Sequence, residues 1–461
     1  MKLQFLTAVV APVALAGCMT VGPDYKEPAL PLPAAWSGFA AEGREDLSRW
    51  WERLEDPLLS RLITEALRAS PDLRSAQAKL REARARRDLA GAQRAPSVDA
   101  SAATSASRSS DPDTTSRLYS AGFDAGWEID VFGGKRRALQ AAEADLQSSA
   151  AGLDATRVTL AAEVARNYVE ARAFRARLAI ARSNLESQSE TLQLTEWRAQ
   201  AGQVSSLELE QARANREQTR AQIPSLETSL AEAQHRLAIL LGLAPAALNE
   251  QLATAAPVPR APARIAVGIP ADVLRQRPDV RAAERTLAAQ TARIGQAEAA
   301  RYPGFSLTGS IGLEAASLDA LTGGATSARA LAAGVSAPIF DGGRLRRQVE
   351  LQRAVQESAQ VSYESTVLTA LEEVENALAA FGNRSARRDA LAEAVTAARN
   401  AALLARHRYT AGLIDFQTVL DTERTVLQIE DSHAASEADG VLALIQLYKA
   451  LGGGWTPGST Q

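Results

Sequence analysis

The residues that could do chemistry in this chain are few and widely separated. His235, His407 and His433 lie on three different stretches, and none has a second histidine or a cysteine nearby at the spacing of a metal site. The Gly-Gly-Lys run that starts at Gly133 lacks the earlier glycine of a phosphate-binding loop, so it does not support nucleotide hydrolysis. No serine, histidine and acid suggest a nucleophilic triad either. We therefore expect no catalysis, no metal and no cofactor.

Cys18, the one cysteine, has a sequence context that predicts lipid attachment. A short basic start, an apolar run containing Pro12 and the residues Leu-Ala-Gly precede it, which is typical of a lipoprotein signal. The apolar run is shorter than the roughly 20 residues of a membrane-spanning helix. We expect residues 1–17 to be removed and Cys18 to carry the lipid, and a plain free thiol is the alternative. Met19, rather than aspartate, resembles the sorting signal of outer-membrane lipoproteins.

The overall composition excludes one class of partner and favours long helices. The chain has 51 Lys and Arg against 54 Asp and Glu, a net charge of −3, so nothing suggests a nucleic-acid partner. Aromatic residues make up 5% and charged residues 23% of the chain. An ordinary mixed α/β enzyme is not the fold that this composition favours.

The chain repeats itself at an offset slightly above 200 residues. The Pro-Asp-Leu-Arg run of residues 71–74 matches the Pro-Asp-Val-Arg run of residues 278–281, and further matches follow in the same order. We therefore expect two equivalent repeats, 58–242 and 278–451, each with a short helix, two strands, a very long helix, a tight turn and a return helix. The prolines of the intervening linker exclude a continuous helix there. The remaining segments are an extended N-terminal part, this linker and a C-terminal tail, at 18–57, 243–277 and 452–461.

Alternating apolar and polar residues predict four strands, two in each repeat. The expected strands are 97–108, 118–130, 304–314 and 330–340. About ten residues is the length of a tilted membrane-spanning strand, although a small soluble sheet with one buried face is the alternative. Four strands cannot close into a barrel, and open edges are not tolerated in hydrocarbon. Three chains would supply 12 strands and leave room for an aqueous lumen.

Long uninterrupted helices follow each pair of strands. Residues 134–201 and 343–411 contain no proline, and their apolar positions recur at coiled-coil spacing. The return helices are expected at 205–241 and 415–451. Pro224 should kink or locally break the first return helix, because its ring removes an internal hydrogen bond.

Four local motifs together resemble those of the TolC/NodT-type outer membrane factors. They are Cys-Met-Thr-Val-Gly-Pro-Asp-Tyr from Cys18, Trp-Trp from Trp50 followed by Asp56-Pro57, Arg-Pro-Asp-Val-Arg from Arg277, and Pro-Ile-Phe-Asp-Gly-Gly from Pro338. The resemblance implies a mainly α fold with a membrane β-barrel portion. It further implies a homotrimer with a 12-stranded outer-membrane barrel and an α-helical periplasmic tunnel. The implied partners are a periplasmic adaptor protein and an inner-membrane pump, commonly of the resistance-nodulation-division type, together with outer-membrane lipid.

The resemblance also implies which residues form the adaptor-contacting tips of the two helical hairpins. Glycine suits both turns, because a left-handed backbone conformation costs it nothing. The expected tip residues are Ala201, Gly202, Gln203, Ala411, Gly412 and Leu413.

The same resemblance implies a pore constriction at Asp421, where three chains would place a ring of carboxylates that selects for cations. Asp415 is a second candidate, and its alternative role is to cap the dipole at the start of the return helix. Thr418 stands where relatives often carry a second carboxylate, so a doubled ring is not expected. A latch contact is implied between the Tyr409 hydroxyl and the Glu208 carboxylate.

We therefore expect a passive exit duct, anchored in the outer membrane by lipid and barrel, that carries small molecules from a tripartite efflux pump. Two alternatives stay open. One is an outer-membrane channel of a protein secretion system, and the other is a periplasmic coiled-coil lipoprotein that acts as a scaffold without a pore.

Overall fold

The computed structural model describes residues 20–37, 46–110, 113–254, 256–262 and 270–455. Contacts within the chain divide it into two units. The first comprises Met1–Leu30, Lys79–Ala150 and Arg281–Ser365, and the second comprises Pro31–Ala78, Ala151–Val280 and Thr366–Gln461. Each unit is described by itself.

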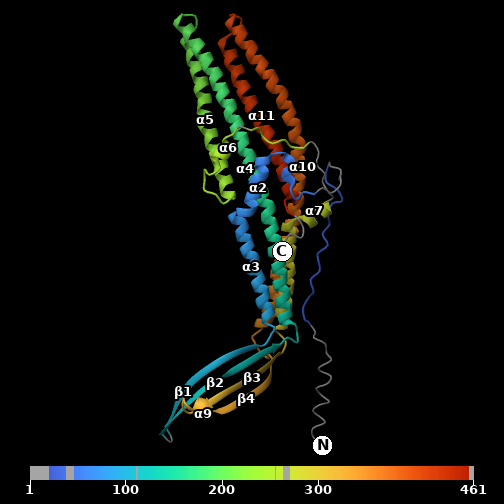
Figure 1. Cartoon of the computed structure of the whole chain (residues 1–461). Helices are drawn as coiled ribbons and strands as arrows, with labels where there is room; N and C mark the ends of the chain where they lie inside the picture. The colour runs from blue at the N-terminus through green and yellow to red at the C-terminus, as the bar shows by residue number, and fades with distance from the viewer. Residues whose placement is uncertain (1–19, 38–45, 111–112, 255, 263–269, 456–461) are drawn as a thin grey trace. The chain divides into compact units, whose positions relative to one another are not determined.

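The elements follow one another in two similar series (Figure 1). The first series is the 3-10 helix η1 (Trp50–Leu54), then α2 (Pro57–Ala69), α3 (Pro71–Ala92), β1 (Ser97–Ser110), β2 (Asp113–Ile129), α4 (Gly134–Gln200) and α5 (Ser206–Leu240). The second series is α6 (Asn249–Ala253), α7 (Pro270–Gln276), α8 (Pro278–Ala299), β3 (Gly304–Ala315), α9 (Ala320–Gly323), β4 (Thr326–Ser336), α10 (Arg344–Thr410) and α11 (Phe416–Ala450). The described helices include none apolar enough over 18 residues to cross a membrane.

The first unit contains one antiparallel sheet with the strand order β1-β2-β3-β4. Two strand boundaries differ from those expected. β2 begins at Asp113 rather than near residue 118, because it pairs with β1 along that strand's whole length. β4 spans Thr326–Ser336 rather than 330–340, and Pro338, which has no N–H to donate, lies beyond its end. The loop before β4 contains the short helix α9, and residues 111–112 of the loop expected between β1 and β2 lie outside the described residues.

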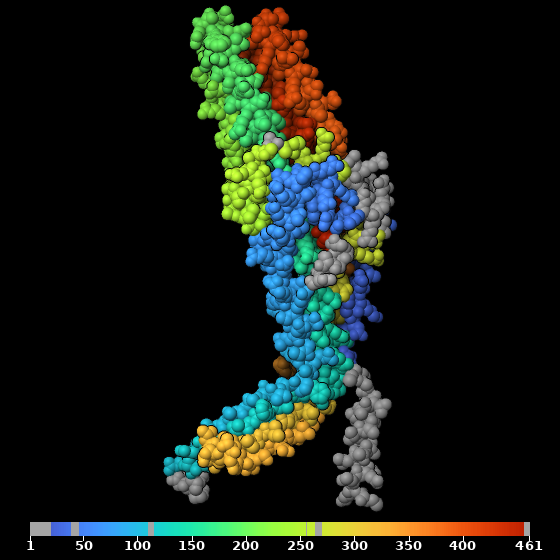
Figure 2. Space-filling model, in the orientation of Figure 1, coloured from blue at the N-terminus to red at the C-terminus, as the bar shows by residue number. Residues whose placement is uncertain are grey.

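The large apolar side chains in the middle of the two central strands, β2 and β3, point to one face of the sheet. Phe123 of β2 lies opposite Ile311 of β3, and Phe305 of β3 lies opposite Val335 of β4. Directly paired residues point to the same face of a sheet. Phe123 is 58% exposed and Val335 67% exposed, so no apolar element among the described residues covers this face. Figure 2 shows the strands of the two repeats side by side in this sheet, the blue-green β1 and β2 against the yellow-orange β3 and β4.

Aromatic side chains gather where the sheet meets the helices of the first unit. The ring of Phe132, just after β2, stacks on Tyr302 at a centroid distance of 4.6 Å and lies 6.5 Å from Phe305. Trp127 Nε1 donates a hydrogen bond to the Arg94 carbonyl oxygen at 3.0 Å. Aromatic residues that have one apolar and one polar partner are typical of a membrane interface.

The segment that follows the expected lipid site is tied firmly to the first unit. The Val21 N–H donates to the Phe132 carbonyl oxygen at 3.2 Å. Arg137 of α4 is only 4% exposed and donates to the carbonyl oxygens of Val21 and Gly22 and to the Asp24 carboxylate, over 2.8 to 3.0 Å. Gly22 has a φ of +86°, and a Cβ there would lie 2.3 Å from the Gly295 Cα. Glycine is therefore required for this close approach of two backbones.

The second unit is built on long helices whose apolar positions face one another. α4 and α10, of 67 residues each, begin in the first unit and continue in the second, whereas α5 and α11, of 35 residues each, belong to the second unit alone. The expected local break at Pro224 is absent, since α5 is one helix from Ser206 to Leu240. A proline removes only its own N–H from the ladder, and the neighbouring hydrogen bonds are sufficient to continue the helix.

The linker between the repeats contains more helix than expected, in α6 and α7. Its last residue, Arg277, explains one of the sequence motifs. Arg277 is 6% exposed, and its guanidinium contacts Asp279, Glu373 and the Ala450 carbonyl oxygen at 2.6 to 3.0 Å. Burial alone would lower the pKa of this guanidinium, but the two carboxylates raise it, so the charge is retained. The motif is therefore a clamp that joins the linker to α10 and α11.

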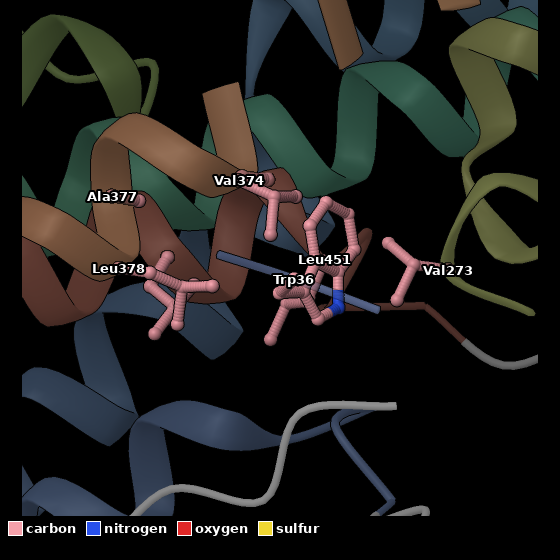
Figure 3. Packing of buried hydrophobic residues seen from close by; sticks show 8 residues of the cluster. Trp36, Val273, Val374, Ala377, Leu378 and Leu451 are labelled. Atoms are coloured by element: carbon pink, nitrogen blue, oxygen red, sulfur yellow. The ribbon is translucent and has the colours of Figure 1, made fainter. Parts of the chain in front are cut away.

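A hydrophobic cluster lies beside this clamp (Figure 3). It brings Trp36 of the extended N-terminal segment and Val273 of α7 onto α10 and α11. Its buried members are Trp36, Val273, Val374, Ala377, Leu378, Leu447, Ala450 and Leu451. Nearby, Trp50 stacks on Tyr448 at 5.2 Å, and Gly453 fits against the Trp50 ring. Segments without regular structure thus complete the core of the second unit.

Candidate functional site

The two helical hairpins of the second unit end in turns with the same hydrogen bonds. After α4, the Gly202 N–H donates to the Ala199 carbonyl oxygen at 3.0 Å and the Gln203 N–H to Arg198 at 2.9 Å. After α10, the Gly412 N–H donates to Tyr409 at 3.0 Å and the Leu413 N–H to Arg408 at 2.9 Å. Both turns are Schellman motifs that satisfy the last carbonyl groups of their helices.

Glycine is needed in these turns for its backbone conformation and not for space. Gly202 and Gly412 have φ values of +68° and +72°, which L residues rarely adopt. A Cβ at either position would meet no atom within 4 Å. All six expected tip residues are exposed, and Leu413 is 72% exposed. The backbone therefore fixes the turn and leaves the side chains free to contact another molecule.

Each return helix begins with a side-chain cap. Ser205 accepts the Glu208 N–H at 3.4 Å at the start of α5. Asp415 accepts the Thr418 N–H at 2.9 Å and the Thr418 hydroxyl at 2.5 Å at the start of α11. The Thr418 hydroxyl and N–H lower the pKa of the Asp415 carboxyl, because they bind its ionised form. The structure thus places Asp415 and Thr418 together in a helix cap.

Asp421 lies one to two turns further along α11 and makes its own contacts. Its carboxylate accepts the Gln417 side-chain amide at 2.9 Å and lies 3.7 Å from the Arg424 guanidinium. The Asp421 side chain is 59% exposed. The side-chain partners of Asp421 are thus Gln417 and Arg424, so the structure groups Asp415 with Thr418 and leaves Asp421 separate. Its role in a constriction stays a prediction.

The structure contains the hydroxyl-to-carboxylate contact expected between Tyr409 and Glu208. The Tyr409 hydroxyl donates to Glu208 Oε2 at 3.3 Å and so links the end of α10 to the start of α5. Arg198 covers the Tyr409 ring at 4.8 Å and Phe416 packs on it at 5.3 Å. Burial raises the pKa of Tyr409, which keeps its hydroxyl protonated as a donor. Whether this contact takes part in gating stays a prediction.

A second link between helices was not anticipated from the sequence. Glu423 of α11 is 3% exposed and its Oε1 accepts from Arg406 of α10 at 2.8 Å and from the Thr191 hydroxyl of α4 at 2.7 Å. Glu423 Oε2 is buried and has no partner among the described residues. A signal for this link does exist, because Glu423 follows Val419 and Leu420 at the spacing of one buried helix face.

Two further ion pairs strengthen the connection between the same helices. Arg177 of α4 forms a two-pronged contact with Asp431 of α11 at 2.6 and 3.0 Å. Glu430 of α11 accepts from Arg399 of α10 at 2.7 Å and from Asn184 of α4 at 2.8 Å. Polar contacts therefore hold α4, α10 and α11 together over several turns, where one side chain typically serves two helices.

Two other expectations concern a metal site and the lipid attachment at Cys18. The described part of the chain contains no cluster of three or more histidine, cysteine, aspartate or glutamate side chains that could hold a metal ion. Cys18 lies outside the described residues, so its lipid attachment stays a prediction.

Comparisons with known proteins agree along almost the whole chain. The sequence model of the family described as outer membrane efflux protein matches twice, over residues 62–243 and 269–453, which confirms the internal repeat. The chain is 33% identical to Nodulation protein T of Rhizobium leguminosarum bv. viciae, over 98% of this chain and 93% of that protein.

Two further likenesses are equally extensive. The chain is 33% identical to the solvent efflux pump outer membrane protein SrpC of Pseudomonas putida, over 96% of both chains. The solved structure of the outer-membrane channel OprN superposes with a TM-score of 0.87 at 37% identity, over 95% of this chain and 100% of that one.

Proposed function

The chain belongs to the outer membrane efflux protein family, and from this premise we propose that three copies form the exit channel of a tripartite efflux pump. The channel would carry small molecules across the outer membrane without catalysis, driven by a pump elsewhere. The observation that carries the proposal is the four-stranded sheet, whose apolar face is exposed and whose outer strands, β1 and β4, each pair on one side only within the part of the chain that the structure describes. Such edges require partner strands in a membrane.

Three copies satisfy this requirement and provide a lumen. The strands of three chains would number 12, enough for a barrel with an aqueous interior, whereas 8 strands are filled by side chains. The long helices α4, α5, α10 and α11 would continue the duct as a tunnel in the periplasm.

The hairpin tips are the surface proposed for contact with a periplasmic adaptor protein. Leu413 is 72% exposed, Leu207 65% and Trp197 60%, and all three lie in or beside the two turns. Exposed apolar residues clustered at the end of a rigid hairpin favour docking of another protein. An inner-membrane pump would be the third component of the assembly.

Bilayer conductance of the purified mature protein, together with its mass in detergent, tests the proposal. A trimer with discrete, cation-preferring conductance steps is the expected result. A monomer or dimer that does not conduct would refute the channel and favour a coiled-coil scaffold. Mass spectrometry of the N-terminal peptide tests the lipid on Cys18, with Cys18→Ala as the unmodified control.

A further inference from the structure

The second unit contains a cavity of about 740 Å³ that no step of the proposed transport uses. It lies between the proline-rich segment 257–262 of the linker and the helices α10 and α11. Its size is that of sites for small organic molecules, which typically measure about 300–1,000 Å³. Its walls come from three different elements, so the cavity is part of the folded unit.

One polar group at the cavity is buried without a partner. Ser436 of α11 lines the cavity and is 1% exposed, and its hydroxyl oxygen has no hydrogen-bond partner among the described residues. Burying a hydroxyl without a hydrogen-bond partner is unfavourable. A ligand with a hydrogen-bonding group would remove that cost.

Space is left for a ligand one helical turn further on. Gly440 lies in the interior of α11 and also lines the cavity, and a Cβ built there meets nothing within 4 Å. Glycine inside a helix is destabilising relative to alanine. No contact of the described residues therefore requires a glycine at this position, and its missing side chain enlarges the cavity.

The charged groups around the cavity favour an anion. Arg260 of the linker and Arg384 and Arg388 of α10 supply three guanidinium groups, against one carboxylate, Glu437. Arg384 uses one nitrogen to donate to the Asp439 carbonyl oxygen at 2.5 Å and keeps further donors. Arg388 pairs with Asp389 at 2.7 Å while its side chain remains 49% exposed. His433 is the remaining titratable group of the lining.

The other walls of the cavity are apolar. Pro259 is buried, Val258 and Phe381 are partly buried, and Val441 is buried at the far side. A guanidinium group binds planar oxyanions such as carboxylate or sulfonate through paired hydrogen bonds. A ligand that suits both sets of walls has an anionic group and a hydrocarbon or aromatic body.

We propose that this cavity is a binding site for one amphipathic organic anion per chain. Its oxyanion lies against Arg384 and Arg388, its apolar body rests on Phe381, Val258 and Pro259, and the Ser436 hydroxyl donates to it. The inference goes beyond the channel function and does not depend on it, because conduction and binding are measured separately.

Equilibrium dialysis of the purified full-length protein with naphthalene-2-sulfonate tests the site, with neutral naphthalene-2-sulfonamide as the matched probe. We expect saturable binding of one sulfonate per chain and at least tenfold weaker binding of the sulfonamide. Arg384→Gln should weaken sulfonate binding about tenfold or more. Arg387→Gln removes a charge from the same helix but outside the cavity lining, and it should leave binding unchanged.

Gly440→Leu separates the site from any effect on folding. The leucine side chain would enter the empty space and block the ligand, while its better helix propensity should keep the thermal stability equal or raise it. The sulfonate that the Gly440→Leu protein still retains in the same detergent measures how much of the probe the micelles take up. Sulfonate binding that persists unchanged in Gly440→Leu, or that is not saturable in the wild-type protein, would overturn the proposal.

Discussion

Replacing the tip glycines with alanine should loosen the hairpin turns without any clash of atoms. Gly202 and Gly412 have φ values of +68° and +72°, and a Cβ at either position has no neighbour within 4 Å. The cost of Gly412→Ala is therefore conformational only, about 1–2 kcal/mol for an L residue in the left-handed region. Because the turn is exposed, we expect local opening of the last turn of α10 rather than unfolding of the protein.

Hydrogen exchange of the tip amides measures this cost directly. The Leu413 N–H donates to the Arg408 carbonyl oxygen at 2.9 Å, so its exchange reports the closed turn. Since 1.4 kcal/mol is a factor of ten, Gly412→Ala should accelerate its exchange about 5- to 30-fold. Gly202→Ala should have the same effect on the Gln203 amide.

The same substitution elsewhere in the chain should act in the opposite direction. Gly152 lies inside α4, has no positive φ, and a Cβ there also meets nothing within 4 Å. Gly152→Ala should therefore stabilise the helix by about 1 kcal/mol and slow exchange nearby. Equal exchange at Leu413 in wild-type and Gly412→Ala protein would refute the argument that backbone conformation selects glycine at the tips.

Three further predictions concern charged groups of α11. Asp421→Ala should change the single-channel conductance and lower the cation preference in planar bilayers, and unchanged values would remove Asp421 from the constriction. Glu423→Gln should destabilise the purified protein by about 1–2 kcal/mol in thermal unfolding, less than a fully buried pair because Arg406 is 37% exposed. As a control, Glu217→Gln, at an ion pair with Arg216 whose carboxylate side chain is 42% exposed, should change the unfolding temperature much less. The pKa of Asp415 is lowered in the folded protein, so its stabilisation of the helix start is present above the ordinary aspartate value of 3.8 and is lost as the pH falls through the lower folded value. Protection of the Thr418 amide, corrected for intrinsic exchange, should fall in that range in the wild-type protein but not in Asp415→Asn, whose amide oxygen caps the helix without titrating.

The sequence predicts the elements of this fold better than their limits. Period-two alternation and heptad spacing each identify a face, and therefore the strands and long helices, because a face must be buried or paired somewhere. These patterns do not reveal which element a face packs against or pairs with. For this reason β4 ends earlier than expected, and α6 and α7 were not predicted. Pro224 shows the same weakness, since the loss of one hydrogen bond does not decide whether a helix of 35 residues continues.

Around the candidate site, the sequence predicts local structure best where one residue acts on its own neighbours. The glycine turns and the Asp415 cap follow from conformational preferences that neighbouring residues express. The contact between Tyr409 and Glu208 came only from the family resemblance. The link between Glu423, Arg406 and Thr191 joins three helices that are far apart in sequence, so no local pattern could have predicted its partners.

The hydrogen bond between Val21 and Phe132 has a geometric consequence for the membrane. Val21 is three positions after Cys18, and a fully extended chain spans at most about 3.6 Å per residue. A lipid-bearing Cys18 would therefore lie within about 11 Å of Val21, which is hydrogen-bonded to Phe132 between the end of β2 and the start of α4. If Cys18 carries the lipid, this short connection would hold the inner surface of the bilayer level with the aromatic residues around Phe132, and would so limit how far each strand can enter the membrane.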